Sequence, residues 1–344
     1  MSILLDGIIF SLQRHGGISV YFKNLIKALV EEGVQHTVLL YSERLQSLSP
    51  TEHVSDVKFE ASRVFERIRN CRLKVDPQVF HSSYYRLPEI KKVPSVVTVH
   101  DFVNEKYNMG PKKWVHSHLK FSAIRSAQHI ICISETTKRD LLSYVEIRPW
   151  QELHVVYNGV SETFRPNLND FSCGNFMLFV GQRSGYKNFK FLLNAMRFLP
   201  DIRLICVGGG AFSKNELGGV EDKTVNRIKH VGYVSDEELN ELYNNAICLV
   251  YPSLYEGFGI PVVEAMRAGC PVISVDCSSV LEIGKDALIV TRSDDPKDLA
   301  SSILAALSTD REYIIRRGME IAGKYSWALT HRKTIDIYKK LANI

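Results

Sequence analysis

The sequence predicts an α/β protein built from two doubly wound parallel sheets. Short apolar runs of strand length alternate with amphipathic stretches of helix length along the chain, which is typical of parallel sheets covered by helices. The alternation restarts once, after a polar stretch at 161–174, and 344 residues suit two domains. We therefore expect one domain over 1–160 and a second over 161–326, with the polar stretch as the linker.

In the first half, an apolar N-terminal strand precedes a helix at 20–32, where Tyr21, Leu25 and Leu29 recur at helical spacing. Further strands are expected at 36–41, 79–83, 95–100, 129–134 and 153–159. In the second half, strands are expected at 176–181, 203–209, 230–234, 247–253, 271–276 and 287–291. The chain closes with an amphipathic helix at 327–344.

The composition excludes several classes of protein. Hydrophobic residues make up 45% of the chain and charged residues 24%, as in soluble globular proteins. No apolar run is long enough for a membrane span, and the N-terminus lacks the basic start of a signal peptide. The seven cysteines include no C-x2-C pair, so we expect no zinc site and a reducing cytoplasm.

The positive charge is concentrated in one half. Residues 1–160 carry 21 lysines and arginines against 16 aspartates and glutamates, whereas the remainder carries 22 of each. This bias predicts an acidic surface or acceptor for the first domain. We expect no nucleic-acid partner.

The most informative motif is YEGFGIPVVEAMRAGCPVIS at 255–274. Glu256 ends a strand–loop, and Glu264 lies inside the helix that follows. The loop between them opens a helix N-terminus, where unpaired N–H groups and the helix dipole favour an anion. An anion flanked by two hydroxyl-binding carboxylates suggests a nucleotide sugar; the alternative is a turn with two solvated acids. The loop residues are Gly257, Phe258, Gly259 and Ile260.

This stretch resembles the E-x7-E signature of the retaining glycosyltransferases of family 4, and the match continues into the EAM-x-AG-x-PVI run, 264–273. The resemblance implies the GT-B fold, in which two Rossmann-like domains face each other across a cleft. It implies that the first domain binds the acceptor and the second the nucleotide-sugar donor. It also implies that the last helix, at about 327–344, packs back on the first domain.

Two motifs of the first half match family landmarks. Gly16 and Gly17, between the first strand and the first helix, match the glycine loop that touches the donor diphosphate; alternatively they form a turn without a ligand. His100 and Asp101 end a strand where open α/β sheets bind ligands, and they resemble the histidine region that meets the donor sugar. Asp101 is expected to orient His100, although such pairs are often structural.

In the second half, Arg183 and Lys187 follow the first strand, where they can neutralise a diphosphate leaving group. The family pattern has an arginine where this chain has Gln182, with Arg183 displaced by one position, so Lys187 is the better candidate. Gly209 lies in a glycine run that gives a ligand access to the backbone. The resemblance puts the nucleotide base near Tyr233.

We therefore predict a cytoplasmic, retaining, metal-independent hexosyltransferase, with mannose favoured, that acts on a glycan or polyprenyl-diphosphate-linked acceptor in bacterial O-antigen or other surface-polysaccharide synthesis. The predicted catalytic residues are His100, Asp101, Lys187 and Glu256, and Glu264 accepts the ribose hydroxyls. No cofactor or metal is expected, because the chain lacks an Asp-x-Asp pair. The alternatives are an epimerase or phosphorylase of the same fold, and a nucleotide-sugar-binding protein without activity.

The segment 63–74 interleaves Arg63, Arg67, Arg69, Arg72 and Lys74 with apolar residues, and we interpret it as a basic amphipathic helix. Such a helix can lie on the anionic inner face of the cell membrane. The alternative is a surface helix that packs on the sheet. A second basic candidate is 111–121, with Lys112, Lys113 and Trp114.

Overall fold

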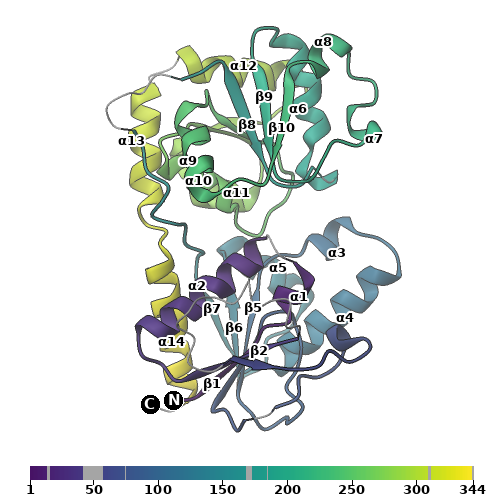
Figure 1. Ribbon diagram of the computed structural model, residues 1–344, viewed down its shortest axis with the longest axis vertical. Helices are drawn as coiled ribbons and strands as arrows, with labels where there is room; N and C mark the ends of the chain where they lie inside the picture. The colour runs from purple at the N-terminus through teal and green to yellow at the C-terminus, as the bar shows by residue number, and fades with distance from the viewer. Residues whose placement is uncertain are drawn as a thin grey trace. The chain divides into compact units, whose positions relative to one another are not determined.

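The computed structural model describes residues 1–13, 16–41, 57–73, 75–167, 173–183, 185–308 and 311–342, with the side chains of residues 112 and 308 left out. The chain forms two compact units, Met1–Gly159 with Trp327–Ile344, and Val160–Ser326. Each unit is a parallel sheet covered by helices (Figure 1). This architecture confirms the predicted fold class.

Within the described residues, the first sheet has seven strands in the order β3-β2-β1-β4-β5-β6-β7, all parallel. The direction of the crossovers reverses between β1 and β4, which makes this pair the switch point of the sheet. The strands are β1 (Ile3–Asp6), β2 (His36–Leu40), β3 (Val57–Phe59), β4 (Val79–Ser82), β5 (Ser95–Val99), β6 (His129–Cys132) and β7 (Glu152–Val155). The helices are α1 (Ile9–Leu12), α2 (Gly17–Glu31), α3 (Val103–Tyr107), α4 (Pro111–Ser126), α5 (Glu135–Tyr144) and α14 (Trp327–Leu341).

The C-terminal helix α14 completes the core of the first unit, where it packs on α2 (Figure 1). Tyr338 is fully buried in the same apolar cluster as Tyr21 and Leu25 of α2. The hydroxyl of Thr330 donates to the carbonyl of Tyr157 over 2.8 Å. A helix far away in sequence therefore belongs to the first unit because its apolar stripe covers the stripe of α2.

In the part of the chain that the structure describes, the second sheet has six parallel strands in the order β10-β9-β8-β11-β12-β13, with its switch point between β8 and β11. The strands are β8 (Phe176–Val180), β9 (Arg203–Val207), β10 (Ile228–Gly232), β11 (Leu249–Tyr251), β12 (Val272–Val275) and β13 (Leu288–Thr291). The helices are α6 (Phe189–Ala195), α7 (Lys214–Leu217), α8 (Asp222–Val225), α9 (Asp236–Asn245), α10 (Ile260–Arg267), α11 (Ser278–Gly284), α12 (Pro296–Ser308) and α13 (Arg311–Ala322).

The first part of the predicted linker is bound to the second unit. Phe164 is 1% exposed, and its ring meets that of Tyr243 edge-on. The backbone N–H groups of Arg165 and Asn167 donate to the side chains of two asparagines of α9. Polar composition predicts a loop here, but the loop is anchored; residues 168–172 of this stretch lie outside the described residues.

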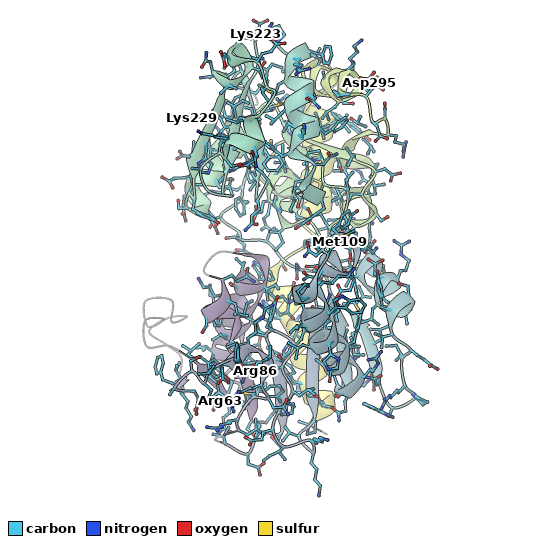
Figure 2. All side chains as sticks on the ribbon, turned by 90° about the vertical axis from the view of Figure 1, so that its right-hand side faces the viewer. Arg63, Arg86, Met109, Lys223, Lys229 and Asp295 are labelled. Atoms are coloured by element: carbon cyan, nitrogen blue, oxygen red, sulfur yellow. The ribbon has the colours of Figure 1, made fainter. Side chains whose placement is uncertain are left out.

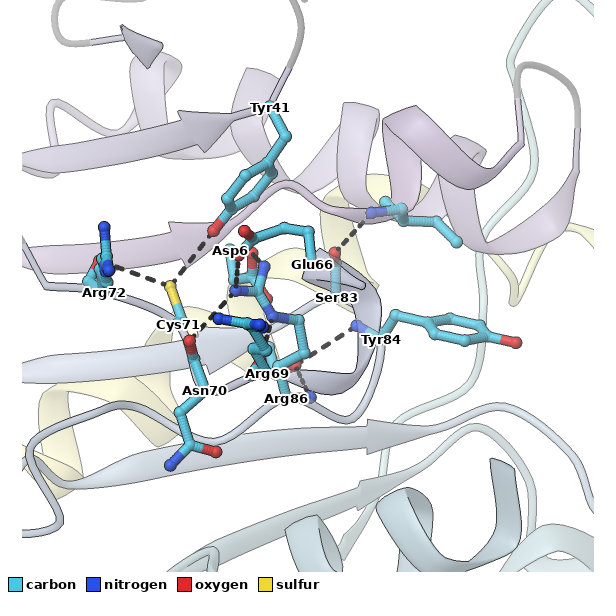
Figure 3. A network of polar contacts seen from close by, with 12 residues as sticks. Asp6, Tyr41, Glu66, Arg69, Asn70, Cys71, Arg72, Ser83, Tyr84 and Arg86 are labelled. Atoms are coloured by element: carbon cyan, nitrogen blue, oxygen red, sulfur yellow. Dashed lines mark hydrogen bonds and ion pairs between the residues drawn. The ribbon is translucent and has the colours of Figure 1, made fainter. Parts of the chain in front are cut away.

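A buried ion-pair network occupies the switch point of the first sheet (Figure 3). The guanidinium of Arg86, 1% exposed, contacts Asp6 at the end of β1 over 3.0 Å and Glu66 over 2.5 Å. It also donates to the carbonyl of Arg69 and lies over the ring of Tyr41. Burial raises the pKa of Asp6. Burial acts in the same direction on Glu66, but hydrogen bonds from Arg63 and the charge of Arg86 lower its pKa to about 2.

The structure contradicts the helix predicted at 63–74. Only Glu66–Ile68 form a single 3₁₀ turn, and Cys71 then pairs with Pro88 as an isolated bridge. Arg63 lies near Arg86 (Figure 2) and clasps Glu66 from the solvent side. Helical periodicity is overridden here because the buried Arg86 requires the Glu66 carboxylate and two backbone carbonyls of this segment. Lys74 lies outside the described residues.

The helices of the described residues include none that combines the length and the apolar character needed to cross a membrane.

Candidate functional site

The switch point of the second sheet brings two predicted residues into contact. The chain leaves β8 towards Lys187 and leaves β11 towards Glu256, and these strands are neighbours. The backbone N–H of Leu254 donates to the carbonyl of Tyr186 over 2.9 Å, which joins the two loops. The ammonium of Lys187 lies 2.5 Å from Glu256 Oε1 and 3.3 Å from the hydroxyl of Tyr251. The side chains of the ion pair are only 13% and 12% exposed.

The loop after Glu256 leads directly into helix α10. Gly259 has φ of 103°, a conformation that favours glycine, and occupies the N-cap position. Phe258 is 2% exposed, and its ring meets that of Tyr325 edge-on. Its side chain is therefore core, and only its backbone can serve a ligand. The hydroxyl of Ser279 donates to the carbonyl of Glu256 over 2.8 Å and fixes the loop.

Glu264 lies in the second turn of α10 and is half-buried. The hydroxyl of Tyr243 donates to its Oε2 over 3.2 Å. Burial and the nearby charge of Asp236 raise the pKa of Glu264 to about 8, although the hydrogen bond from Tyr243 acts against them. Glu264 therefore holds a proton at neutral pH, and hydroxyl donors from a ligand would favour its loss.

Arg183 occupies a different environment from the predicted one. Its side chain is 1% exposed and is paired with Glu216 over 2.6 Å. The two terminal nitrogens donate to the carbonyls of residues 208–211 at 2.7 to 3.3 Å. The hydrogen-bond donors of Arg183 are thus used within the protein, and they hold the 208–211 loop in place. Gln182, at the position of the family arginine, is exposed.

The loop that Arg183 holds contains the predicted Gly209. Gly208, Gly209 and Gly210 all have φ between 73° and 77°, a run that side chains rarely allow. A Cβ on Gly209 would lie 2.9 Å from the carbonyl oxygen of Gly181, so the backbone at Gly209 is in close contact with the backbone at Gly181. Tyr233 follows β10, is 58% exposed and lies beside Gly208. The loop and the aromatic ring are adjacent, as a base-binding platform requires.

In the first unit, His100 follows β5 and is 6% exposed. Its ring meets that of Tyr21 edge-on at a centroid distance of 5.3 Å. Burial lowers the pKa of His100 to about 4; Asp101 acts against this effect and Lys120 adds to it. The buried Nε2 of His100 has no hydrogen-bond partner among the described residues.

Among the hydrogen bonds of the described residues, none joins Asp101 to His100. The Oδ1 of Asp101 accepts the N–H of Val103 over 2.9 Å, which caps the turn into α3. Its carbonyl accepts from the ammonium of Lys120 over 2.7 Å, and Lys120 also pairs with Glu105. The turn that carries His100 is thus held by a buried lysine of α4.

Gly16 and Gly17 form the start of α2. Gly17 is the first helical residue, and Gly16 precedes it in an extended conformation. A Cβ on Gly16 would come within 1.8 Å of the Gln13 amide oxygen, so the side chain of Gln13 now fills that space. The preceding residues 14–15 lie outside the described residues.

Several residues of these sites were not predicted. Tyr251 and Ser279 contact the Lys187–Glu256 pair, and Tyr243 contacts Glu264. Tyr251 ends β11, lies inside the strand predicted at 247–253 and could have been found by its place at the sheet edge. Lys120 carries no signal beyond its position in a helix, because only the tertiary fold buries it.

Both units match known protein families. The second unit matches a model described as "Glycosyl transferases group 1" over residues 160–321. The first matches "Glycosyltransferase Family 4" over residues 15–164.

The chain is also similar to individual proteins. It is 35% identical over 175 residues to O-antigen chain mannosyltransferase B of Escherichia coli, and the alignment covers 48% of this chain and 46% of that protein. The chain thus aligns with about half the length of this relative. Its fold resembles sucrose-phosphate synthase from Thermosynechococcus elongatus, with a TM-score of 0.78, 19% identity and 99% of each chain covered. It also resembles Anabaena HepE in complex with UDP-glucose, with a TM-score of 0.74, 16% identity and coverage of 99% and 100%.

At these identities the solved structures establish the fold alone, and they agree with two Rossmann-like domains of the GT-B type. The family models add the assignment, because together they extend from residue 15 to residue 321 and include both units. The chain therefore belongs to the family 4 glycosyltransferases.

Proposed function

We propose that this glycosyltransferase is a retaining hexosyltransferase that uses a nucleotide-diphosphate sugar. The observation that carries the proposal is the contact between Lys187 and Glu256 at the switch point of the second sheet. A cation, a carboxylate and the N-terminus of α10 meet where parallel sheets bind ligands. In this scheme the second unit binds the donor and the first unit binds the acceptor.

Each residue then has a separate task. Lys187 and the 257–260 loop bind the diphosphate. Glu264 accepts hydrogen bonds from the ribose hydroxyls, and Glu256 and His100 contact the sugar. The acceptor oxygen attacks the anomeric carbon from the same face as the one from which the leaving group departs. As the carbon–oxygen bond to the phosphate breaks, the leaving phosphate takes the acceptor proton. No side-chain nucleophile is required.

The preferred sugar is mannose, and the preferred acceptor is a glycan or a polyprenyl-diphosphate-linked saccharide of O-antigen or lipopolysaccharide synthesis on the cytoplasmic side. The similarity to an O-antigen chain mannosyltransferase supports this choice. The similarity to a protein in complex with UDP-glucose supports a nucleotide-sugar donor in general. GDP-mannose is the first donor to test.

A thermal-shift screen of nucleotide sugars, followed by product analysis, tests the proposal. A donor that binds only the folded protein raises its Tm by mass action. Transfer to an acceptor with the anomeric configuration kept is the expected result. Sugar isomerisation, or phosphorolysis with inorganic phosphate, would identify an epimerase or phosphorylase instead. Binding of a nucleotide sugar without transfer to any tested acceptor would favour a nucleotide-sugar-binding protein that has no activity.

Donor affinity should increase as the pH rises towards 8. Ribose hydroxyls donate best to an ionised Glu264, whose pKa is about 8, so binding below that pH must expel a proton. Affinity should therefore rise up to tenfold per pH unit below pH 8 and level off above it. Calorimetry with a nucleotide sugar in buffers of different ionisation enthalpy measures the released proton.

Glu264→Gln is the control for this effect. At pH 8.5 it should bind the donor roughly ten- to a hundred-fold more weakly, the loss of a charge-assisted hydrogen bond. The difference should shrink at pH 6.5, where the native carboxyl is also neutral. An unchanged pH profile in the variant would contradict the role of Glu264.

Activity should survive EDTA. In the proposed site, Lys187 and the helix dipole of α10 neutralise the diphosphate charge, and no carboxylate-bound metal is needed. A turnover assay with and without chelator measures this directly. Complete loss of activity that Mn²⁺ or Mg²⁺ restores would overturn the charge scheme.

We also propose that residues 63–73 attach the first unit to anionic membranes, as an exposed loop and not as a helix. Arg67, Arg69 and Arg72 are exposed, and each cation near such a surface contributes about 1 kcal/mol. Changing all three to glutamate should release the protein from anionic vesicles in a salt-dependent sedimentation assay. Turnover of a short soluble acceptor should not change. A wild-type protein that never sediments with vesicles would refute the attachment.

A further inference from the structure

An open groove with a volume of about 540 Å³ lies in the first unit, between the turn at 66–70 and helix α4. Ile68 lines one side, and Trp114, Val115 and Leu119 of α4 line the other. Ile68 is 48% exposed and Trp114 is 75% exposed. Exposed apolar residues that have no function are usually scattered singly over a protein surface. Large exposed apolar side chains that gather on both sides of one groove therefore indicate a binding surface.

The wall formed by the turn is held rigidly. Arg86 is one of the residues that line the groove, and its guanidinium donates to Glu66 and to the carbonyl of Arg69. Two aromatic residues, Phe65 beside the turn and Tyr85 in the lining, have φ of 60° and 58°. Bulky residues adopt this left-handed conformation only where their surroundings impose it, and such strain concentrates at ligand sites.

The charge of the groove has one sign. Among the described residues that line it, Arg69, Arg86 and His118 are basic or titratable, and none is acidic. Arg86 is neutralised by its buried partners, whereas the exposed guanidinium of Arg69 pairs with no described residue. Arg67 and Arg72 lie on the same exposed segment. An apolar trough with a cationic rim complements a molecule that has a hydrocarbon chain and an anionic head.

We propose that this groove binds the polyprenyl chain of a lipid-linked acceptor, with the lipid phosphate at Arg69 and the chain between Ile68 and Trp114. The proposal rests on the proposed function for one point, namely that the lipid is the anchor of the acceptor. Binding in the groove would present the saccharide from the first unit, while the donor residues belong to the second.

Farnesyl diphosphate, a short soluble prenyl diphosphate, is the probe that tests the groove. Calorimetry is performed with the probe alone, and inorganic pyrophosphate is titrated separately to identify any site that recognises the diphosphate alone. Wild-type protein should bind the probe more tightly than pyrophosphate. Trp114→Ala should weaken binding about tenfold, which corresponds to losing one buried apolar contact. Arg69→Gln should weaken it as well, and farnesol should bind less tightly than the diphosphate.

Trp150→Ala is the matched control, because Trp150 is 49% exposed in the same unit but does not line the groove. It should bind the probe like wild type. Equal losses in Trp114→Ala and Trp150→Ala, or no binding by wild type, would overturn the groove. If nucleotide sugars bind but the probe does not, the groove fails while the proposed function stands. If the probe binds in the groove but no nucleotide sugar is turned over, the groove stands and the proposed function fails.

Discussion

Replacing Lys187 with alanine should lower kcat by about 10²- to 10³-fold, the range seen when one charge-stabilising group is removed from an active site. In the proposed mechanism, negative charge grows on the leaving diphosphate as the bond to the sugar breaks. The ammonium of Lys187 would then stabilise that charge more in the transition state than in the bound donor. The expected signature is a large fall in kcat with a smaller rise in the donor KM.

The variant also leaves Glu256 without its partner, so a second variant separates the two effects. Lys187→Arg keeps a cation beside Glu256, so kcat should fall less in this variant than in Lys187→Ala. Lys190→Ala, which removes an exposed lysine three positions further on, is the matched control and should leave kcat unchanged. A Lys187→Ala enzyme with wild-type kcat would show that another group neutralises the leaving phosphate.

Replacing Arg86 with alanine should destabilise the first unit by about 3–5 kcal/mol, because it leaves the buried carboxylate of Asp6 without a counter-charge and removes one of the two cations that contact Glu66. Asp6 is fully buried and Glu66 is 5% exposed, so water cannot replace the guanidinium at either position. The turn at 66–70 would lose its anchor at the same time. Thermal or urea unfolding measures the loss, and the transition of the second unit should stay in place.

Arg63→Ala provides the comparison for this variant. Arg63 contacts the same glutamate, but its side chain is 21% exposed, so its loss should cost about 1 kcal/mol or less. Adding Asp6→Asn and Glu66→Gln to an Arg86→Met background should recover part of the stability, because the unpaired charges are then gone. Equal effects of Arg63→Ala and Arg86→Ala would show that burial does not decide the energy of this network.

The strands were the most predictable part of the fold. Val79–Ser82 and Val272–Val275 are fully buried, so their apolar runs identify them from composition alone. Val57–Phe59 was missed, since this edge strand is short and only half-buried. The helix predicted at 63–74 was wrong because its periodicity concealed Glu66 and Cys71, which are buried by partners elsewhere in the chain.

The candidate site was predictable where its residues are neighbours in sequence. The sequence by itself determined the alternation of strands and helices, and the spacing that places Glu256 before α10 and Glu264 within it, since both depend on local periodicity. Tertiary structure alone decided that Lys187 meets Glu256, 69 residues away, and that Arg183 turns inward to Glu216, 33 residues away. It also decided that Arg86 is buried against Asp6, 80 residues away. The sequence around a charged residue does not indicate which residue it pairs with, because burial and pairing arise only when separate strands assemble into one sheet.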